Sequence, residues 1–161
     1  MEKIVVVGAG QAGASCVAKL RAEGFGGAIT LIGEEPVPPY QRPPLSKAYL
    51  LGEMALERLY LRPEKFYDDN GITLKLGQKV ERLDRDARVV VLGGEKVAYD
   101  QLVLATGSRP RRLPEAIGGA LGGVHVVRGL RDVDVMEKKM LAGKKALIVG
   151  GGYIGLEAAA V

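Results

Sequence analysis

The alternation of apolar and polar positions near the start of the chain predicts a strand, a helix and a second strand. The β-branched run Lys3–Gly8 leads into a glycine turn, and Gln11–Glu23 has the helical spacing of apolar residues. A second β-branched run, Ala28–Ile32, ends at Gly33. Together these segments have the length of one βαβ unit, about 30 residues, so we expect parallel strands joined by a helix.

A proline-rich segment follows this unit. Glu34–Pro44 contains five prolines, and proline lacks the N–H that helices and central strands require, so we expect an ordered loop. After it, Leu45–Leu51 has the pattern of a short helix, for which Ser46 would be the cap.

Short alternating strands are predicted over Ile72–Tyr99. The pair Gly93–Gly94 separates Val89–Leu92 from Lys96–Val97, which is the pattern of a β-hairpin. We therefore expect a small antiparallel meander that interrupts the α/β pattern. Gln101–Ala105 is predicted to be another buried strand.

The last third of the chain predicts the start of a second α/β unit. The stretch Arg109–Gly123 is rich in Pro, Gly and Arg, which is typical of a crossing between domains. Leu130–Leu141 has helical spacing and is ended by Gly143. Lys145–Val149 is predicted to be a strand, and a glycine turn recurs directly after it.

Two glycine-rich turns thus follow predicted strands and open predicted helices. Both have the spacing G-x-G-x-x-G, which in this context indicates a dinucleotide site. The two turns are Gly8-Ala9-Gly10-Gln11-Ala12-Gly13 and Gly150-Gly151-Gly152-Tyr153-Ile154-Gly155. We predict an α/β fold: a Rossmann-like dinucleotide-binding domain with an inserted antiparallel β-meander, then the beginning of a second Rossmann-like domain. The first domain would span residues 1–112 and the second residues 113–161.

The first turn has the chemistry of a pyrophosphate site. Its glycines let the backbone approach a phosphate, whose charge is met by free N–H groups and by the positive end of the helix near Gln11. An acidic residue about 20 residues further on is needed to accept hydrogen bonds from the adenosine ribose. Glu34 is the candidate, with Glu35 as the alternative. A lone glycine turn would be a weak signal, but here the strand, helix, second strand and acid are all in register.

The sequence ends within the last predicted helix. Glu157–Val161 contains no capping residue, and neither a strand nor an acid for a second ribose follows it. We therefore expect the chain to be part of a longer polypeptide. The residue that distinguishes NADH from NADPH would lie beyond Val161, so the choice stays open.

Composition is that of a soluble globular protein. Of the 161 residues, 47% are hydrophobic and 26% are charged, and the apolar runs are far shorter than the roughly 20 residues of a membrane span. The N-terminus lacks the features of a signal peptide, which favours the cytoplasm. The single cysteine, Cys16, cannot form an internal disulfide, so redox chemistry would need a bound cofactor. We assign Cys16 a packing role, and the single histidine, His125, no role and no metal.

The charge balance gives little support to nucleic-acid binding. The net charge of +4 and the pI of about 9.2 are a mild excess rather than a dense basic stripe. A cluster at Arg109, Arg111 and Arg112 could attract an acidic partner or a phosphate, but a solvated surface is the simpler interpretation.

The proline-rich loop carries a resemblance to a known family. The segment Pro38–Leu50, PPYQRPPLSKAYL, resembles the flavin-lining loop of FAD-dependent ferredoxin reductases, which include putidaredoxin, rhodocoxin and dioxygenase reductases, with apoptosis-inducing factor as a distant relative. The likeness continues through Leu102–Pro110, similar to the family's A-T-G segment, and through the second glycine turn to Glu157. It covers essentially the whole chain and implies FAD at the first site and NAD at the second, with NADH favoured over NADPH.

The resemblance implies roles for particular residues. Arg42 would meet the FAD pyrophosphate, Pro43 would pack against the isoalloxazine, and Lys47 would lie near flavin N5 and O4. Val80 resembles the residue whose backbone faces the adenine, and Arg128 resembles another arginine that contacts FAD. Further cofactor-binding positions are Gly8, Gly10, Ala12, Gly13, Glu34, Ala105, Thr106, Gly107, Gly150, Gly152, Tyr153, Ile154 and Gly155.

Lys47 and Glu157 are the catalytic candidates by this resemblance, with Glu157 as the partner of the lysine. A reduced flavin carries negative charge, which a fixed cation in a dry site stabilises more than water does. A buried lysine needs such a carboxylate to stay charged. Without the loop, we would interpret Lys47 as a solvated helix residue and Glu157 as an ordinary first-turn acid.

The function implied is transfer of electrons from NAD(P)H through FAD to a [2Fe-2S] ferredoxin that serves an oxygenase or a P450. One alternative is reduction of a small molecule, as in monodehydroascorbate reductases, which have a similar P-x-L-S-K loop. Another is a non-enzymatic flavin-binding sensor or scaffold, as the likeness to apoptosis-inducing factor allows. Thiol-dependent relatives are disfavoured because Glu34–Leu51 contains no cysteine. Neither nucleic acid nor a membrane is expected as a partner.

Overall fold

The computed structural model describes residues 1–140 and 143–161, and the chain divides into two units. The first unit comprises Met1–Gln41 and Tyr60–Gly107, and the second comprises Arg42–Leu59 and Ser108–Val161. The predicted boundary between residues 112 and 113 concerns the dinucleotide-binding domains and stays a prediction.

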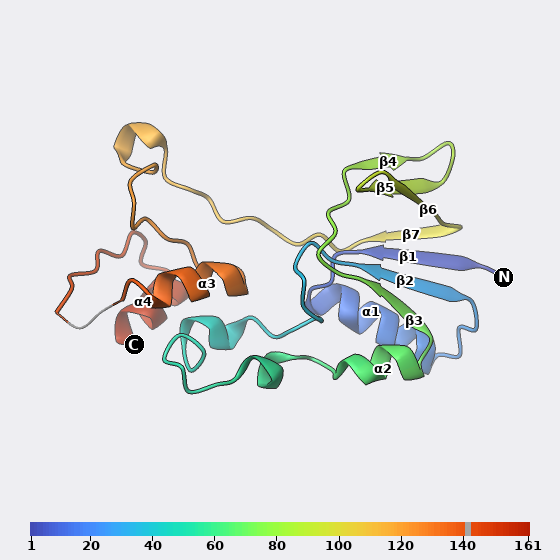
Figure 1. The fold of residues 1–161 in the computed structure, drawn as a ribbon, viewed down its shortest axis with the longest axis horizontal. Coiled ribbons are helices and arrows are strands. Elements are labelled where there is room, and N and C mark those ends of the chain that lie inside the picture. Colours follow the sequence, from blue (N-terminus) through green and yellow to red (C-terminus); the bar gives the residue numbers. More distant parts are fainter. Residues whose placement is uncertain (141–142) are drawn as a thin grey trace. The chain divides into compact units, whose positions relative to one another are not determined.

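A four-stranded parallel sheet with the order β3-β2-β1-β7 forms the first unit (Figure 1). Its strands are β1 Lys3–Val7, β2 Ala28–Ile32, β3 Ile72–Lys75 and β7 Gln101–Leu104. The first two strands lie where the β-branched runs predicted them, because such residues suit strands that are covered on both faces. The α/β class is thereby confirmed.

The central strand β1 contributes to two hydrophobic cores. The helices of the first unit are α1 Gln11–Ala22 and α2 Glu64–Asp69. On one face of the sheet, Ile4 and Val6 pack in the core that includes Val17 of α1 and Tyr67 of α2. The alternate side chains of β1 join the core on the other face, under the antiparallel strands (Figure 1). Successive side chains of a strand point to opposite faces, so one apolar strand serves both cores.

The predicted antiparallel meander is confirmed as a three-stranded sheet. Its strands are β4 Arg82–Asp84, β5 Val89–Leu92 and β6 Glu95–Ala98. The turn residues Gly93 and Gly94 have φ values of +55° and +84°, as a two-residue hairpin turn requires. The expectation that this pattern begins at Ile72 is wrong, because Ile72–Lys75 pairs in parallel with β2 and extends the main sheet.

The strand β7 is less buried than predicted. Leu102 and Val103 are half-buried, and Leu104 is exposed. Among the described strands β7 pairs only with β1, so one of its edges has no paired strand.

The proline-rich loop is ordered without a regular element before Pro43, as predicted. Tyr40 is buried and forms an isolated antiparallel bridge with Tyr60. The Leu61 N–H donates to the Pro39 carbonyl at 2.9 Å. These backbone contacts fix the loop, because proline leaves few N–H groups for bonding within it.

The helix predicted over Leu45–Leu51 is wrong. A short 3-10 helix, Pro43–Ser46, is followed by hydrogen-bonded turns. Lys47 has φ −137° and ψ −120°, outside the helical region, which prevents the helix from continuing. Ser46 does not cap a helix, because its hydroxyl donates to Glu157.

The second unit contains α3 Leu130–Glu137 and α4 Tyr153–Ala160, with 3-10 turns at Leu56–Leu59 and Glu115–Ile117. Leu130, Val133 and Met136 of α3 are buried at helical spacing. The Asp132 carboxylate accepts a hydrogen bond from the Gly129 N–H at 3.0 Å and so caps the helix. The predicted helix Leu130–Leu141 is confirmed as far as Glu137, and Leu141 lies outside the described residues.

The strand predicted at Lys145–Val149 is wrong. This segment pairs with no strand among the described residues. Leu147 and Val149 are instead exposed. A β-strand needs a hydrogen-bonded neighbour, which an apolar run does not supply by itself.

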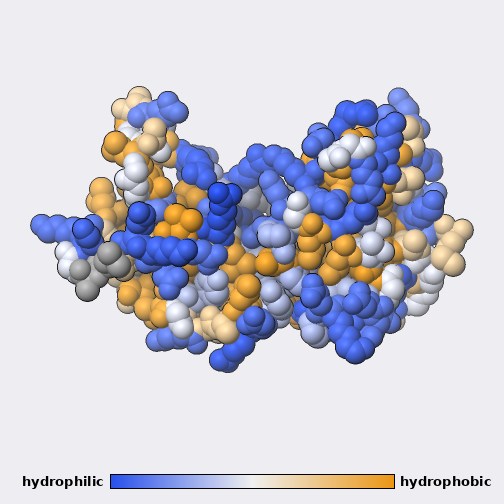
Figure 2. Space-filling view, viewed as in Figure 1, coloured by the Kyte–Doolittle hydropathy of each residue, from blue (hydrophilic) through white to orange (hydrophobic). Residues whose placement is uncertain are grey.

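No helix in the described part of the chain has the length and apolar character needed to cross a membrane. On the face drawn in Figure 2, polar and apolar side chains are intermixed over each unit.

Candidate functional site

The first glycine turn lies against the segment that follows β7. Gly8 has a φ of +117°, and a Cβ there would lie 2.5 Å from the carbonyl carbon of Ala105 and 3.1 Å from the amide nitrogen of Thr106. A side chain at position 8 would therefore be excluded by both backbone strain and space. The structure brings together the turn and the A-T-G segment, which the sequence proposed as parts of one site.

The last glycine of the turn is needed for close packing within it. A Cβ on Gly13, which is buried in α1, would collide with the carbonyl oxygen of Gly8. Alanine at this position would therefore disturb the start of the helix. The fold itself explains why Gly8 and Gly13 are glycines.

Gly10 differs, because nothing in the fold requires a glycine there. Its φ of −91° and ψ of −167° suit any residue, and no heavy atom would lie within 4 Å of a Cβ. Gly10 precedes Gln11 at the N-terminus of α1, and this helix has no side-chain cap and no acidic residue in its first turn. The free N–H groups and the open position form a cradle that fits an anion, and a Cβ would fill it.

The two candidate acids for the ribose have different environments. The Glu35 carboxylate is half-buried and accepts a hydrogen bond from the Tyr40 hydroxyl at 2.6 Å. The Glu34 side chain is 66% exposed, with Lys79 Nζ 4.0 Å from its carboxylate. Glu34 is therefore the carboxylate that is more open to a ligand.

The segment that contains Val80 is bonded to the backbone around Glu34. The Gln78 N–H donates to the Gly33 carbonyl at 2.9 Å, and the Gly77 N–H donates to the Glu35 carbonyl at 3.0 Å. Val80 itself is half-buried against the core under the meander. The structure thus brings Val80 into the neighbourhood of the ribose candidate.

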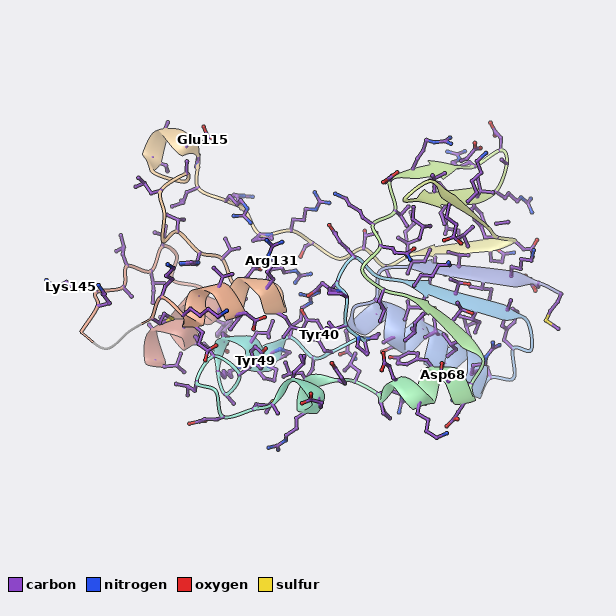
Figure 3. The ribbon with its side chains drawn as sticks, in the orientation of Figure 1. Tyr40, Tyr49, Asp68, Glu115, Arg131 and Lys145 are labelled. Atoms are coloured by element: carbon purple, nitrogen blue, oxygen red, sulfur yellow. The ribbon has the colours of Figure 1, made fainter. Side chains whose placement is uncertain are left out.

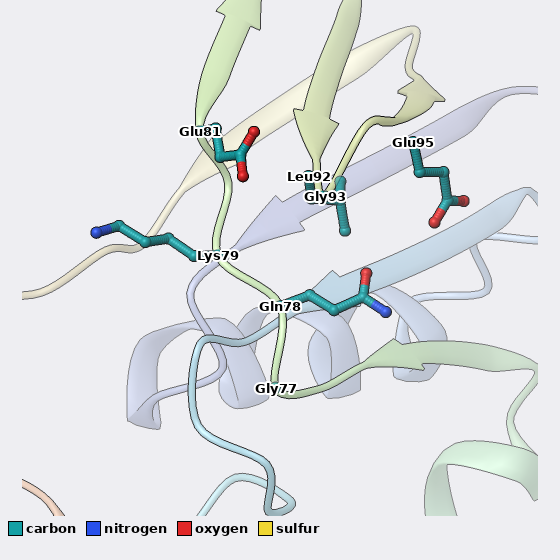
Figure 4. A pocket seen from close by; sticks show the side chains of 7 residues that line it. All are labelled: Gly77, Gln78, Lys79, Glu81, Leu92, Gly93 and Glu95. Atoms are coloured by element: carbon teal, nitrogen blue, oxygen red, sulfur yellow. The ribbon is translucent and has the colours of Figure 1, made fainter.

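A pocket of about 380 Å³ lies where this segment passes the β5–β6 hairpin (Figure 4). Its lining residues are Gly77, Gln78, Lys79, Glu81, Leu92, Gly93 and Glu95. Lys75 Nζ contacts both Glu95 carboxylate oxygens, at 2.8 and 2.9 Å, which restrains one wall. The sequence did not indicate this pocket, because it depends on how the hairpin packs.

The second unit brings Lys47 and Glu157 into direct contact. Lys47 Nζ lies 2.9 Å from Glu157 Oε1, and the Ser46 hydroxyl donates to Glu157 Oε2 at 2.7 Å. The hydrogen bond from Ser46, followed by that from Lys47, lowers the pKa of the Glu157 carboxyl below its ordinary value. The carboxylate is therefore held in its charged form beside the ammonium group.

Arg42 and Arg128 are also brought together. The Arg42 guanidinium donates to the carbonyl of Arg128, and the Arg128 N–H donates to Asp132 Oδ2 at 3.2 Å. Arg42 stands directly before Pro43, which begins the 3-10 helix. The two predicted FAD arginines and Pro43 are thus neighbours in this unit.

Tyr49 is a neighbour of this group that the sequence did not single out. Figure 3 labels Tyr49. Its hydroxyl donates to Asp134 Oδ1 of α3 at 2.9 Å. Partial burial and then the hydrogen bond to Asp134 raise the pKa of Tyr49 to about 12. This bond ties the chain after Lys47 to α3. No pattern in the sequence predicts that Tyr49 contacts Asp134.

The second glycine turn repeats the geometry of the first. Gly150 has a φ of +113°, close to that of Gly8, and a Cβ on Gly155 would lie 2.5 Å from the Gly150 carbonyl oxygen. Gly152 has φ −77° and open space around it, as Gly10 has. Tyr153 and Ile154 follow in the first turn of α4 and are exposed.

Cys16 packs partly buried against the main core, as predicted. His125 Nε2 is buried, and none of the described residues offers it a hydrogen-bond partner. The described residues include no group of His, Cys, Asp and Glu that could hold a metal ion.

Comparison with known proteins identifies the family. Residues 2–161 match the pyridine nucleotide-disulphide oxidoreductases. The chain belongs to this family. Its members are oxidoreductases that combine FAD with a pyridine nucleotide.

Curated relatives in this family include ferredoxin reductases. The chain is 48% identical over 158 residues to rhodocoxin reductase of Rhodococcus erythropolis, with 98% of this chain and 37% of that protein covered. It is 47% identical to the ferredoxin–NAD(+) reductase component of the p-cumate 2,3-dioxygenase system of Pseudomonas putida, with 99% and 40% covered. The chain thus spans less than half the length of these relatives.

Solved structures agree with the fold. The covalent putidaredoxin reductase–putidaredoxin complex superimposes with a TM-score of 0.92 at 43% identity, covering 99% of this chain and 39% of that chain. A ferredoxin reductase from Rhodopseudomonas palustris gives a TM-score of 0.91 at 40% identity, with 99% and 39% covered.

Proposed function

We propose that the protein containing this chain is an FAD-dependent ferredoxin reductase that passes electrons from NADH to a [2Fe-2S] ferredoxin serving an oxygenase or a P450. The observation that carries the proposal is the open glycine at position 10, at the uncapped N-terminus of α1. The acceptor is supported by the names of the relatives, which include rhodocoxin reductase and a dioxygenase reductase component.

In the first unit, the turn Gly8–Gly13 would bind the FAD pyrophosphate, because Gly10 has open space around it at the uncapped N-terminus of α1, the positive end of that helix. Glu34 would accept hydrogen bonds from the adenosine ribose. The backbone at Val80 would face the adenine, and Ala105–Gly107 would line the flavin. In the second unit, the turn Gly150–Gly155 would bind the NADH pyrophosphate in the same way.

The remaining roles belong to the second unit. Lys47, paired with Glu157, would provide a fixed positive charge near flavin N5 and O4. Arg42 would neutralise phosphate charge, Pro43 would pack against the ring, and Arg128 would add a further contact. Bound FAD supplies the chemistry of accepting a hydride and releasing electrons one at a time.

The same proposal includes NADH rather than NADPH as the electron donor. It also includes the cytoplasm as the location. The relative from the p-cumate system is named for NAD(+), which supports NADH. The single cysteine of this chain supports a reducing compartment.

The cradle is tested by Gly10→Ala in the complete protein, with Gly26→Ala as the matched control. Both glycines have room for a Cβ and lack positive φ, so both variants should fold like the parent protein. We expect Gly10→Ala to lose FAD affinity at least about tenfold, through a methyl group in the path of the pyrophosphate. Gly26→Ala should retain FAD. Unchanged flavin content in folded Gly10→Ala would refute the cradle.

The acceptor is tested by stopped-flow mixing of the FAD-loaded protein with NADH and then with an oxidised [2Fe-2S] ferredoxin. Rapid flavin reduction followed by electron transfer to the ferredoxin is expected. Turnover with monodehydroascorbate alone would make the protein a small-molecule reductase. Tight, salt-sensitive DNA binding without turnover would instead favour the scaffold role.

A further inference from the structure

Apart from the tyrosines Tyr40 and Tyr67, Ser46 is the only polar or charged residue that is buried in the described part of the chain, with 4% of its surface exposed. A buried hydroxyl needs a hydrogen-bond partner, and this one donates to a carboxylate, Glu157 Oε2, at 2.7 Å. Hydrogen bonds to charged acceptors are stronger than those between neutral groups.

The next residue in the chain reaches the other oxygen of the same carboxylate. Lys47 Nζ lies 2.9 Å from Glu157 Oε1. Neighbouring side chains in a regular helix or strand point in different directions. Here the 3-10 helix ends at Ser46, and the non-helical backbone of Lys47 lets both side chains converge on Glu157.

The two contacts with Glu157 differ in their exposure to water. The side chains of Lys47 and Glu157 are 49% and 32% exposed, and ion pairs at this exposure are weakly held because water competes. Ser46 is shielded, so its hydrogen bond is the contact that restrains the carboxylate. With Oε2 held, Oε1 is directed at the lysine.

Other charged groups nearby do not replace these contacts. The 3-10 helix Pro43–Ser46 packs against α3 and α4. Among the described groups, Ser46 and Lys47 are the ones that lower the pKa of Glu157. Asp134 and Glu137 of α3 instead raise the pKa of Tyr49. The charged residues that flank the 3-10 helix or lie in α3 and α4 are Arg42, Lys47, Arg131, Asp132, Asp134, Glu137 and Glu157.

We propose that Ser46 is a positioning residue, which fixes the Glu157 carboxylate and through it the Lys47 ammonium. The catalytic consequence of this inference rests on the proposed function. The contact between Ser46 and Glu157, in contrast, is present in the structure of this chain. Ser46 acts through Glu157 and need not touch the flavin.

The direct test is the titration of the Glu157 carboxyl in the complete protein, followed by ¹³C NMR on glutamate-labelled samples. Glu157→Gln identifies the signal. In Ser46→Ala we expect the titration midpoint to rise, because a hydrogen bond to the charged form is lost. Ser46→Thr keeps the hydroxyl and should restore the parent midpoint. Ser15→Ala, at an exposed serine of α1, is the control.

A catalytic readout accompanies the titration. The acidic limb of the pH profile for flavin reduction by NADH should move to higher pH in Ser46→Ala, and Ser46→Thr should reverse the shift. If Ser46→Ala does not fold, Ser46→Cys replaces it, because a thiol is a weak donor of similar size. A Glu157 midpoint unchanged in the folded Ala or Cys variant would overturn the proposal. Failure of the parent protein to bind FAD or oxidise NADH would instead refute the proposed function and leave the midpoint test intact.

Discussion

Arg21 joins two connections of the first unit through its guanidinium group. Nε donates to the Asn70 carbonyl at 2.7 Å and Nη2 to the Gly71 carbonyl at 2.9 Å, at the turn that ends α2. Nη1 donates to the carbonyls of Phe25 and Gly27, at 2.5 and 2.8 Å, in the connection from α1 to β2. One side chain therefore satisfies four backbone carbonyls, and both connections lead directly into strands of the parallel sheet.

The expected cost of Arg21→Ala follows from these bonds. Each hydrogen bond contributes about 0.5–1.5 kcal/mol net, and bonds to charged groups lie at the upper end. Because the side chain is half-buried and water replaces some of the bonds, we expect the free energy of unfolding to fall by about 2–4 kcal/mol. Arg21→Lys should lose nearly as much, because an ammonium cannot match four carbonyls arranged around a planar guanidinium.

The assay is urea denaturation of the complete protein followed by circular dichroism. Arg85→Ala is the matched control, since this exposed arginine forms no hydrogen bond or ion pair within the described residues, and its change should stay within about 0.5 kcal/mol. A loss below about 0.5 kcal/mol in Arg21→Ala, with an unchanged denaturant slope, would refute the account of this arginine.

Two tyrosine-to-phenylalanine substitutions should have opposite effects on the free energy of unfolding. The Tyr67 hydroxyl is buried with no hydrogen-bond partner in the described structure, and burial raises its pKa; Tyr67→Phe should therefore leave stability unchanged or raise it by up to about 1 kcal/mol in urea denaturation. Tyr49→Phe removes the bond to Asp134 and should cost about 1 kcal/mol at pH 8. The pKa of Tyr49 is raised from 10.0 to about 12, so its stabilisation is complete below pH 10 and is lost as the pH rises through 12. A destabilised Tyr67→Phe, or a Tyr49→Phe variant with parental stability at pH 8, would contradict these expectations.

The elements predicted correctly are those whose signal is local. The βαβ start and the Gly93–Gly94 hairpin follow from β-branched runs and from glycines in left-handed conformations, which neighbouring residues largely determine. The prediction at Lys145–Val149 was wrong because a strand also needs a paired neighbour. The pattern of Ile72–Lys75 indicated a strand but could not tell a parallel from an antiparallel partner.

For the candidate site, the sequence alone predicted the two glycine turns, because the spacing of glycines acts through the backbone of a single turn. The resemblance of the proline-rich loop suggested Lys47 and Glu157. Only the tertiary structure decided that Ser46 is buried against Glu157. It also decided that Gly10, unlike Gly8 and Gly13, is open to a ligand. Both depend on which distant segments pack around a residue, and no local pattern encodes that packing.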